Sequence, residues 1–473
     1  MIDLHNLTIK KAHEDMKSGK YSAVDLATAY LEVSKAKNAE INAYREIFAD
    51  VIEQAKLADE KFKNGTATAL TGIPFAIKDN ILIKGRIAGS SSKILENYHA
   101  TYDATVIEKL KKEGVVFVGR TNMDEFALGG STEKSAYGVT KNPHDLERVP
   151  GGTSGGSAAA VAADMCLVAL GSDTGGSVRQ PSSFCGVVGL KPTYGSVSRF
   201  GLMAAVSSFD QIGPICKNIE DTKIVFDAIA GIDPKDSTTI SKDTYKIKET
   251  KKPVIGVLKS LLNQGGIKEE VLTNFYESVE KFKKLGYEVK DIDIPNASGA
   301  LPVYYILNFA EVSSNLSRFD GMRFGLHKDG KDGIDDYFET KGAGFGKEVR
   351  RRVLLGTYVL SSGYYDAYYN RANALRRVIT ADFLQAFEKI DIILTPTAPA
   401  PAFKIGEKIS DPVAMYLEDI FTVTANLTGM PAMSIPSGVS EVGDKKLPLG
   451  LQMTAPHGNE NLLFSVGKEF LGE

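Results

Sequence analysis

The sequence predicts an α/β fold in which a large mixed β-sheet is covered on both sides by helices. From residue 73 onward, short apolar runs alternate with helical stretches, as in IPFAIK at 73–78, VVFVG at 115–119 and CLVALGS at 166–172. This alternation is typical of a parallel or mixed sheet. The composition agrees, because 43% hydrophobic and 24% charged residues are the proportions of a globular protein with an ample core.

The first 65 residues predict an N-terminal helical layer. Ser22 and Asp25 have the spacing of a capping box, in which each side chain bonds the backbone N–H of the other residue. Apolar residues then recur at helical spacing, at Leu26, Tyr30 and Val33. We therefore expect a helix that begins just after Ser22.

A polar, lysine-rich stretch at 233–252 predicts a surface crossing that separates residues 66–232 from residues 233–473. After it we expect a helix near 269–285 and a strongly helical region at 347–389. The expected strands are VIGVLK (254–259), YEVKDIDI (287–294), IDIILTP (390–396), MPAMSIP (430–436) and LPLGLQM (447–453). The last three are candidates to rejoin the first sheet.

Charge and cysteine content exclude several classes of protein. A formal net charge of −3 and a pI near 6.2 argue against a broad basic face for nucleic acid. Three cysteines without zinc-type pairing suit a reducing compartment and predict no metal site. Because the sequence shows no signal-peptide pattern and no run of about 18 apolar residues, we expect a cytoplasmic protein without membrane contact.

One unusual pattern occurs twice, as GGTSGGS at 151–157 and GSDTGGS at 171–177. Glycines let the backbone turn sharply and bring amide N–H groups close to a ligand, while Ser and Thr add hydroxyls beside those donors. The apolar segment between the runs, 158–170, predicts one buried helix followed by one buried strand. The two loops would then meet around one pocket suited to acyl transfer.

Ser177 is the candidate nucleophile, and it needs a base. Lys78 is the candidate base, because it follows the apolar run IPFAI, and burial lowers the pKa of a lysine toward its neutral form. A surface lysine at a strand end is the plain alternative. His144, the histidine near the glycine runs, is a competing base. Residues 152–156 also fit G-x-S-x-G, which would make Ser154 the nucleophile, although the motif here follows a polar loop instead of a strand.

With Lys78, the two glycine-hydroxyl runs and Ser177, the chain resembles the amidase signature family over nearly its whole length. Within the family it is similar to the A subunits of tRNA-dependent amidotransferases, through segments such as TNMDEFALGGSTE from Thr121 and GFGKEVRRR from Gly344. The resemblance implies the amidase-signature fold. It makes 66–232 the core with the catalytic residues and 233–473 the remainder of the same domain, with substrate-specificity helices and returning strands.

The resemblance also implies a Ser-Ser/Thr-Lys triad. Ser177 forms an acyl-enzyme, Lys78 is the terminal base, and a hydroxyl on a cis peptide relays the proton between them. The family has serine at the relay position, whereas this chain has Thr153 followed by Ser154. Either Thr153 relays with its χ1 angle restricted by the extra methyl group, or Ser154 takes over.

Glutamine is the implied substrate. The resemblance assigns the α-carboxylate of glutamine to Arg352, its α-amine to Asp419, and the positioning of its side chain to Tyr304. A guanidinium matches a carboxylate as a fork, which agrees with the first assignment. The implied oxyanion hole consists of the backbone amides of Thr174, Gly175, Gly176 and Ser177.

The ammonia released from glutamine would need an acceptor. The resemblance implies a heterotrimer, in which the B subunit uses ATP and Mg²⁺ to activate Glu-tRNA(Gln) and a small C subunit braces the other two. We therefore expect no cofactor in this chain and only indirect contact with tRNA. Two other functions stay open, namely a free-standing amidase for another amide and a non-catalytic scaffold whose relay Thr153 has disabled.

Overall fold

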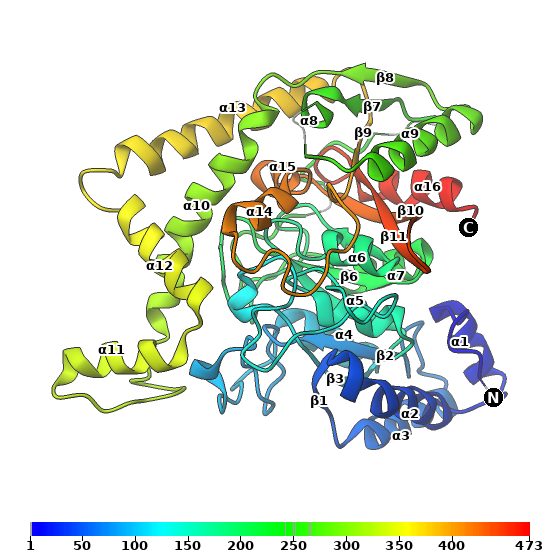
Figure 1. Ribbon diagram of the computed structural model, residues 1–473. Coiled ribbons are helices and arrows are strands. Elements are labelled where there is room, and N and C mark those ends of the chain that lie inside the picture. The colour runs from blue at the N-terminus through cyan, green and yellow to red at the C-terminus, as the bar shows by residue number, and fades with distance from the viewer. Residues whose placement is uncertain (1, 242, 249, 251, 264–265) are drawn as a thin grey trace.

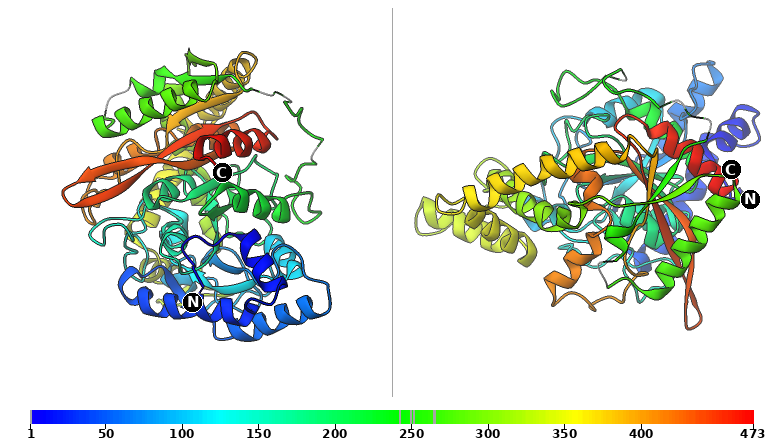
Figure 2. Two further views of the ribbon diagram at one scale, coloured as in Figure 1. Left: turned by 90° about the vertical axis from the view of Figure 1, so that its right-hand side faces the viewer. Right: turned by 90° about the horizontal axis from the view of Figure 1, so that it is seen from above.

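The computed structural model describes residues 2–241, 243–248, 250, 252–263 and 266–473. Over these residues eleven strands form one mixed sheet in the order β1-β3-β2-β4-β6-β5-β10-β11-β9-β7-β8. Helices pack around this sheet (Figures 1 and 2). The predicted α/β fold with a large mixed sheet is confirmed.

The strands are β1 (Tyr44–Ile47), β2 (Pro74–Lys78), β3 (Val116–Thr121), β4 (Val168–Asp173), β5 (Val188–Lys191), β6 (Gln211–Cys216), β7 (Ile255–Leu258), β8 (Val289–Ile292), β9 (Ile392–Pro396), β10 (Ala432–Val442) and β11 (Lys445–Thr454). The earlier helices are α1 (Ile9–Lys17), α2 (Ala23–Ile41), α3 (Val51–Lys63), α4 (Thr105–Glu113), α5 (Gly155–Ala162), α6 (Arg179–Cys185) and α7 (Ile219–Ile229). The later helices are α8 (Lys259–Leu262), α9 (Glu269–Lys284), α10 (Ala300–Asn315), α11 (Gly333–Gly344), α12 (Lys347–Val359), α13 (Arg371–Ala386), α14 (Pro412–Tyr416), α15 (Val423–Thr428) and α16 (Glu460–Leu471).

The N-terminal part is a helical layer with one exception. Helix α2 begins after Ser22, whose hydroxyl accepts the N–H of Asp25 while the Asp25 carboxylate accepts the N–H of Ser22, so the predicted capping box is present. Between α2 and α3, however, β1 pairs antiparallel with β3 and joins the central sheet. The first 65 residues therefore share the core of the rest of the chain.

The second half returns to the same sheet. Strand β10 pairs with β5, and β11 pairs with β9, so the last predicted strands do rejoin the first ones. The region 347–389 is helical but broken, because α12 ends at Val359 and a turn through Ser361, Ser362 and Gly363 precedes α13. In the predicted surface crossing at 233–252, Lys242, Glu249 and Lys251 lie outside the described residues. The division into 1–65, 66–232 and 233–473 stays a prediction.

The order of the strands brings the two chemical motifs together. Strand β2 lies between β3 and β4 and is parallel to both, so Lys78 at the end of β2 and Ser172 near the end of β4 reach the same edge. The first glycine-hydroxyl run leads into α5, which packs on β4 and β2, and the second leads into α6. Ligand sites in such sheets lie beyond the carboxyl ends of parallel strands.

Helices α10 to α13 form an arm that projects from the body of the protein (Figures 1 and 2). Helix α10 packs against α12, α13 and α15, which fixes the base of the arm to the core. Tyr304 lies on α10 and Arg352 on α12. Within the described ranges, no helix has the length and apolar character needed to cross a membrane.

Candidate active site

Lys78 lies at the centre of a buried cluster of hydroxyl groups. Its side chain is fully buried, and its Nζ atom lies 2.8 Å from both the Thr153 hydroxyl and the Ser154 hydroxyl. The hydroxyl of Ser172 and the carbonyl oxygen of the same residue lie at 2.9 and 3.2 Å. Burial lowers the pKa of Lys78 to about 7, although nearby carboxylates oppose the shift. A lysine with this pKa is neutral often enough to accept a proton near pH 7.

The two hydroxyls beside Lys78 have different surroundings. Ser154 donates to the carbonyl oxygen of Ser172 at 3.2 Å and accepts the N–H of Ser172 at 3.3 Å, so β4 holds it on both sides. Thr153, which follows a cis peptide bond after Gly152, has Lys78 as the hydrogen-bond partner of its hydroxyl among the described residues. The proton of the Thr153 hydroxyl therefore stays available for another acceptor.

Ser177 is in backbone contact with Ser154 and is slightly exposed to solvent. It is 7% exposed, and its carbonyl oxygen accepts the N–H of Ser154 at 3.1 Å. Among the residues that the structure describes, its hydroxyl makes no hydrogen bond, and catalytic hydrogen bonds are often open before substrate binds. The structure thus brings the backbone of Ser177 against that of Ser154, one of the residues whose hydroxyls contact Lys78.

The loop before Ser177 presents backbone N–H groups. Within the described chain, the amides of Thr174, Gly175 and Ser177 make no hydrogen bond and remain available to a ligand. The Gly176 amide differs, because it donates to the carboxylate of Asp173 at 2.9 Å. Gly176 has φ of +128°, a conformation that requires glycine, and it turns its amide toward Asp173.

A buried ion pair between Asp173 and Arg179 holds the loop before Ser177 in place. The guanidinium of Arg179 contacts the carboxylate of Asp173 at 2.9 and 3.0 Å, and both side chains are fully buried. Burial alone would raise the pKa of Asp173, but Arg179 together with other neighbours, among them Asn426, holds this pKa well below its usual range. The remaining N–H groups of Arg179 donate to the carbonyl oxygen of Thr422 and the side chains of Gln452 and Asn426.

Tyr304, Arg352 and Asp419 meet on the far side of the same loop. A Cβ atom on Gly175 would lie 2.3 Å from the Tyr304 hydroxyl, so this tyrosine packs directly against the loop. Asn308 joins Tyr304 to Arg352, because its amide donates to the tyrosine hydroxyl at 3.2 Å and its carbonyl accepts from the guanidinium at 3.1 Å. Asp419 accepts the hydroxyl of Tyr305 at 2.6 Å, and burial raises the pKa of Asp419 to about 7.

Sequence reasoning missed the groups that hold these side chains. Glu348 contacts Arg352 at 2.9 Å, and this ion pair lowers the pKa of Glu348 to about 2 despite burial. Because the two residues are four positions apart on one helix, the sequence pattern alone could have predicted this ion pair. In the sequence, Asp173 and Arg179 are only two opposite charges on either side of a predicted turn. The other partners of Arg179 are distant in sequence, so no local pattern predicts them.

The competing assignments lack support in the geometry. The carbonyl oxygen of Cys185 accepts a hydrogen bond from His144 Nε2, 3.0 Å away and outside the Lys78 cluster. Ser154 lies fully buried before α5, and an irregular loop precedes it where the G-x-S-x-G motif requires a strand.

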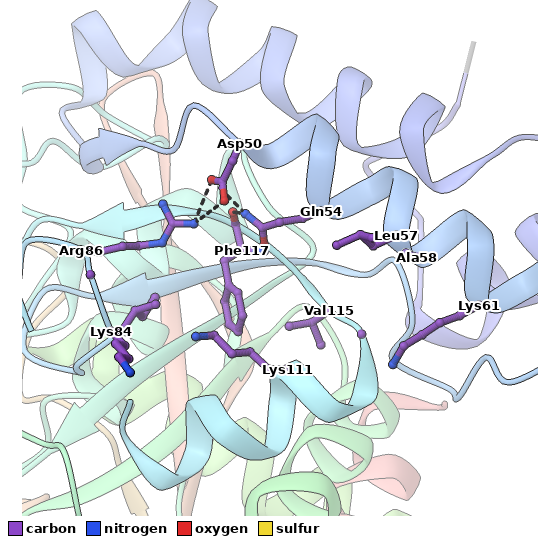
Figure 3. A pocket seen from close by; sticks show the side chains of 13 residues that line it. Asp50, Gln54, Leu57, Ala58, Lys61, Lys84, Arg86, Lys111, Val115 and Phe117 are labelled. Atoms are coloured by element: carbon purple, nitrogen blue, oxygen red, sulfur yellow. Dashed lines mark hydrogen bonds and ion pairs between the residues drawn. The ribbon is translucent and has the colours of Figure 1, made fainter. Parts of the chain in front are cut away.

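A cavity of about 540 Å³ lies elsewhere, between α3, β3 and the end of α4 (Figure 3). It contains none of the predicted site residues, and two of its basic side chains already have partners. Arg86 pairs with Asp50 at 2.8 Å, and Lys61 donates to a backbone carbonyl oxygen at 2.7 Å. We therefore place the candidate site at Lys78 and Ser177.

Comparison with known proteins shows the family of the chain. The pattern of the family described as Amidase matches residues 25–464. The chain belongs to the amidase family. Within it, the A subunit of the glutamyl-tRNA(Gln) amidotransferase from Thermoanaerobacter pseudethanolicus is 53% identical over 99% of this chain and 96% of its own length.

Solved structures of the family share the fold. The A subunit of the glutamyl-tRNA(Gln) amidotransferase from Thermotoga maritima superposes with a TM-score of 0.79 at 40% identity, covering 99% of this chain and 94% of its own. A 6-aminohexanoate cyclic dimer hydrolase with bound substrate reaches a TM-score of 0.82 at 26% identity, covering 100% and 97%. The fold is therefore shared by proteins with different activities, whereas the high sequence identity places this chain among the A subunits.

Proposed function

We propose that this chain is the glutamine-hydrolysing subunit of a tRNA-dependent amidotransferase and supplies ammonia for the conversion of Glu-tRNA(Gln) to Gln-tRNA(Gln). The observation that carries the chemistry is the contact of the buried Lys78 amine with the Thr153 hydroxyl, on a loop whose next residue, Ser154, bonds the backbone of Ser177. Relatives that are about half identical over nearly the whole chain support the choice of reaction.

The first half of the reaction forms an acyl-enzyme. Neutral Lys78 accepts a proton from Thr153, which takes one from Ser177 as the Ser177 oxygen attacks the side-chain amide carbon of glutamine. Negative charge then develops on the amide oxygen, where the free amides of Thr174, Gly175 and Ser177 can hold it; one such donor is worth about 3 kcal/mol. The C–N bond breaks, and the leaving nitrogen takes the proton back through Thr153 as ammonia.

Water completes the reaction. A water molecule gives a proton to the same relay and attacks the ester carbon, which releases glutamate and returns the proton to Ser177. Thr153 is the better relay of the two hydroxyls, because Ser154 already donates its proton to the backbone of β4. A scaffold without catalysis has no evident use for a lysine buried among these hydroxyls.

Glutamine would be recognised by the two oppositely charged side chains near Gly175, those of Arg352 and Asp419. Arg352 would bind the α-carboxylate and Asp419 the α-ammonium group, with Tyr304 between them and the reacting amide. An incoming ammonium group favours the ionised form of Asp419 and so lowers its pKa from about 7. The released ammonia would pass to a B subunit, which uses ATP and Mg²⁺ to activate Glu-tRNA(Gln), with a C subunit bracing the pair.

The decisive experiment follows the acyl-enzyme by mass spectrometry. Wild-type chain with B and C subunits should co-purify, hydrolyse glutamine faster when Glu-tRNA(Gln) is present, and show a glutamyl ester on Ser177. The Ser177→Ala variant should lose this adduct. Persistence of the adduct would place the nucleophile elsewhere, and activity on simple amides without any partner effect would favour a free-standing amidase.

A further inference from the structure

Two adjacent carboxylates lie behind the active site and contact different parts of it. Asp124 is fully buried, and its oxygens accept the N–H groups of Ser131, Thr132 and Lys134 at 3.2, 2.8 and 3.1 Å. The Thr132 hydroxyl in turn donates to the carbonyl oxygen of Gly151 and accepts the N–H of Gly155, at 2.8 and 3.1 Å. Asp124 therefore fixes the turn that holds both ends of the loop with Thr153.

Glu125 points to the other part of the site. Its carboxylate accepts the Ser92 hydroxyl at 2.5 Å and the N–H of Gly346 at 2.9 Å. Gly346 is the N-cap residue of α12, the helix that carries Arg352, and a carboxylate favours this end of a helix. A Cβ atom on Gly346 would lie only 2.3 Å from the Glu125 carboxylate.

We propose that Asp124 and Glu125 are positioning residues with separate tasks. Asp124 holds the relay loop on Lys78, and Glu125 holds the start of α12 so that Arg352 meets the substrate carboxylate. This assignment rests on the proposed glutaminase function. According to this proposal, one short segment holds both the relay loop with Thr153 and the helix that carries Arg352.

The two tasks separate in steady-state kinetics of the chain assembled with its partner subunits. Asp124→Asn should lower kcat for glutamine about tenfold or more and leave KM within about twofold, because one amide oxygen cannot accept three fixed backbone N–H groups. Glu125→Met should raise KM about tenfold with kcat nearly unchanged, because α12 loses its acceptor.

Conservative replacement provides a further test. Glu125→Gln should restore a nearly normal KM, because the Ser92 hydroxyl can rotate to accept from the new amide while the amide oxygen still accepts the N–H of Gly346. Gly346→Ala should raise KM like Glu125→Met, because the added methyl group displaces the carboxylate from the opposite side. This variant also replaces Glu125→Met if the latter does not fold.

Asp221 offers a matched control. It is a buried carboxylate that accepts the N–H of Ile9 at 3.0 Å, at the start of α1, a helix without site residues. Asp221→Leu should lower the melting temperature without changing kcat or KM. If Glu125→Met or Gly346→Ala leaves KM unchanged, or if Asp221→Leu raises KM equally, the positioning assignment is wrong. A wild-type complex without glutaminase activity would instead refute the proposed function.

Discussion

Lys78 and Lys191 are both buried lysines whose pKa lies near 7, yet they occupy different regions of the sheet. Burial is the main cause in both, and Arg179 adds to the effect at Lys191. The amine of Lys78 faces three hydroxyls, whereas the amine of Lys191 donates to the carbonyl oxygen of Pro192 at 2.8 Å. A lowered pKa therefore does not identify a catalytic base, and the groups that can exchange a proton with the amine do.

Replacement of each lysine by methionine should give the largest difference between the two regions. Lys78→Met should lower kcat for glutamine by about 10²- to 10⁴-fold, because the acyl-transfer step loses its general base. Lys191→Met should keep kcat within about threefold, since the amine of Lys191 donates to a backbone carbonyl oxygen away from the hydroxyl cluster. Glutamate release by the assembled complex is the measurement.

Circular dichroism should show that both variants fold. Equal losses of activity in two folded variants would mean that the contacts of Lys78 have no special role. An active Lys78→Met variant would remove lysine from the relay altogether.

The pH dependence should show the same contrast. Lys78 must be neutral to accept a proton, so kcat at saturating glutamine should fall as the pH drops below about 7, tenfold for each unit. Saturation matters because Asp419, whose pKa also lies near 7, affects binding of the α-amine. Lys191→Met should leave this acid limb in place.

Asp124→Asn should move the acid limb to lower pH. Among the carboxylates that favour the charged form of Lys78, namely Asp124, Asp173 and Asp210, the first has the strongest effect, so its loss further lowers the pKa of Lys78. A limb that stays fixed in Asp124→Asn and shifts in Lys191→Met would assign the titration to Lys191.

The contrast between the two lysines also shows which features of the site could be predicted from the sequence. The strand before Lys78 and the repeated glycine-hydroxyl runs are local patterns, and local patterns predicted the nucleophile and the base. Strand β6 escaped notice because Gly213 and Pro214 weaken its strand character, although it pairs with both β4 and β5. Its place in the sheet depends on partners distant in sequence.

Contacts between distant segments were beyond reach for the same reason. Asp124 and Glu125 stand in one short motif, and nothing in their spacing shows that one holds a turn and the other a helix more than two hundred residues away. The break between α12 and α13 was visible as Ser-Ser-Gly at 361–363, but the helical character of its flanks dominated the prediction. Local sequence patterns predicted the candidate catalytic residues, whereas they did not predict the distant residues that hold the site in place.

Variants of the two hydroxyls beside Lys78 should show which of them is the relay. Thr153→Ser should leave kcat equal or slightly higher, because it keeps the hydroxyl and frees its χ1 angle. Thr153→Ala should lower kcat about a hundredfold, because Lys78 and Ser177 lose the hydroxyl between them. Ser154→Ala should lower kcat less than Thr153→Ala does, since the Ser154 hydroxyl donates to the carbonyl oxygen of Ser172 and serves the packing of β4.

Single-turnover formation of the Ser177 ester measures the effect of all three substitutions. A larger loss in Ser154→Ala than in Thr153→Ala would make Ser154 the relay, and unchanged rates in both would leave Lys78 to act on Ser177 without an intermediate hydroxyl.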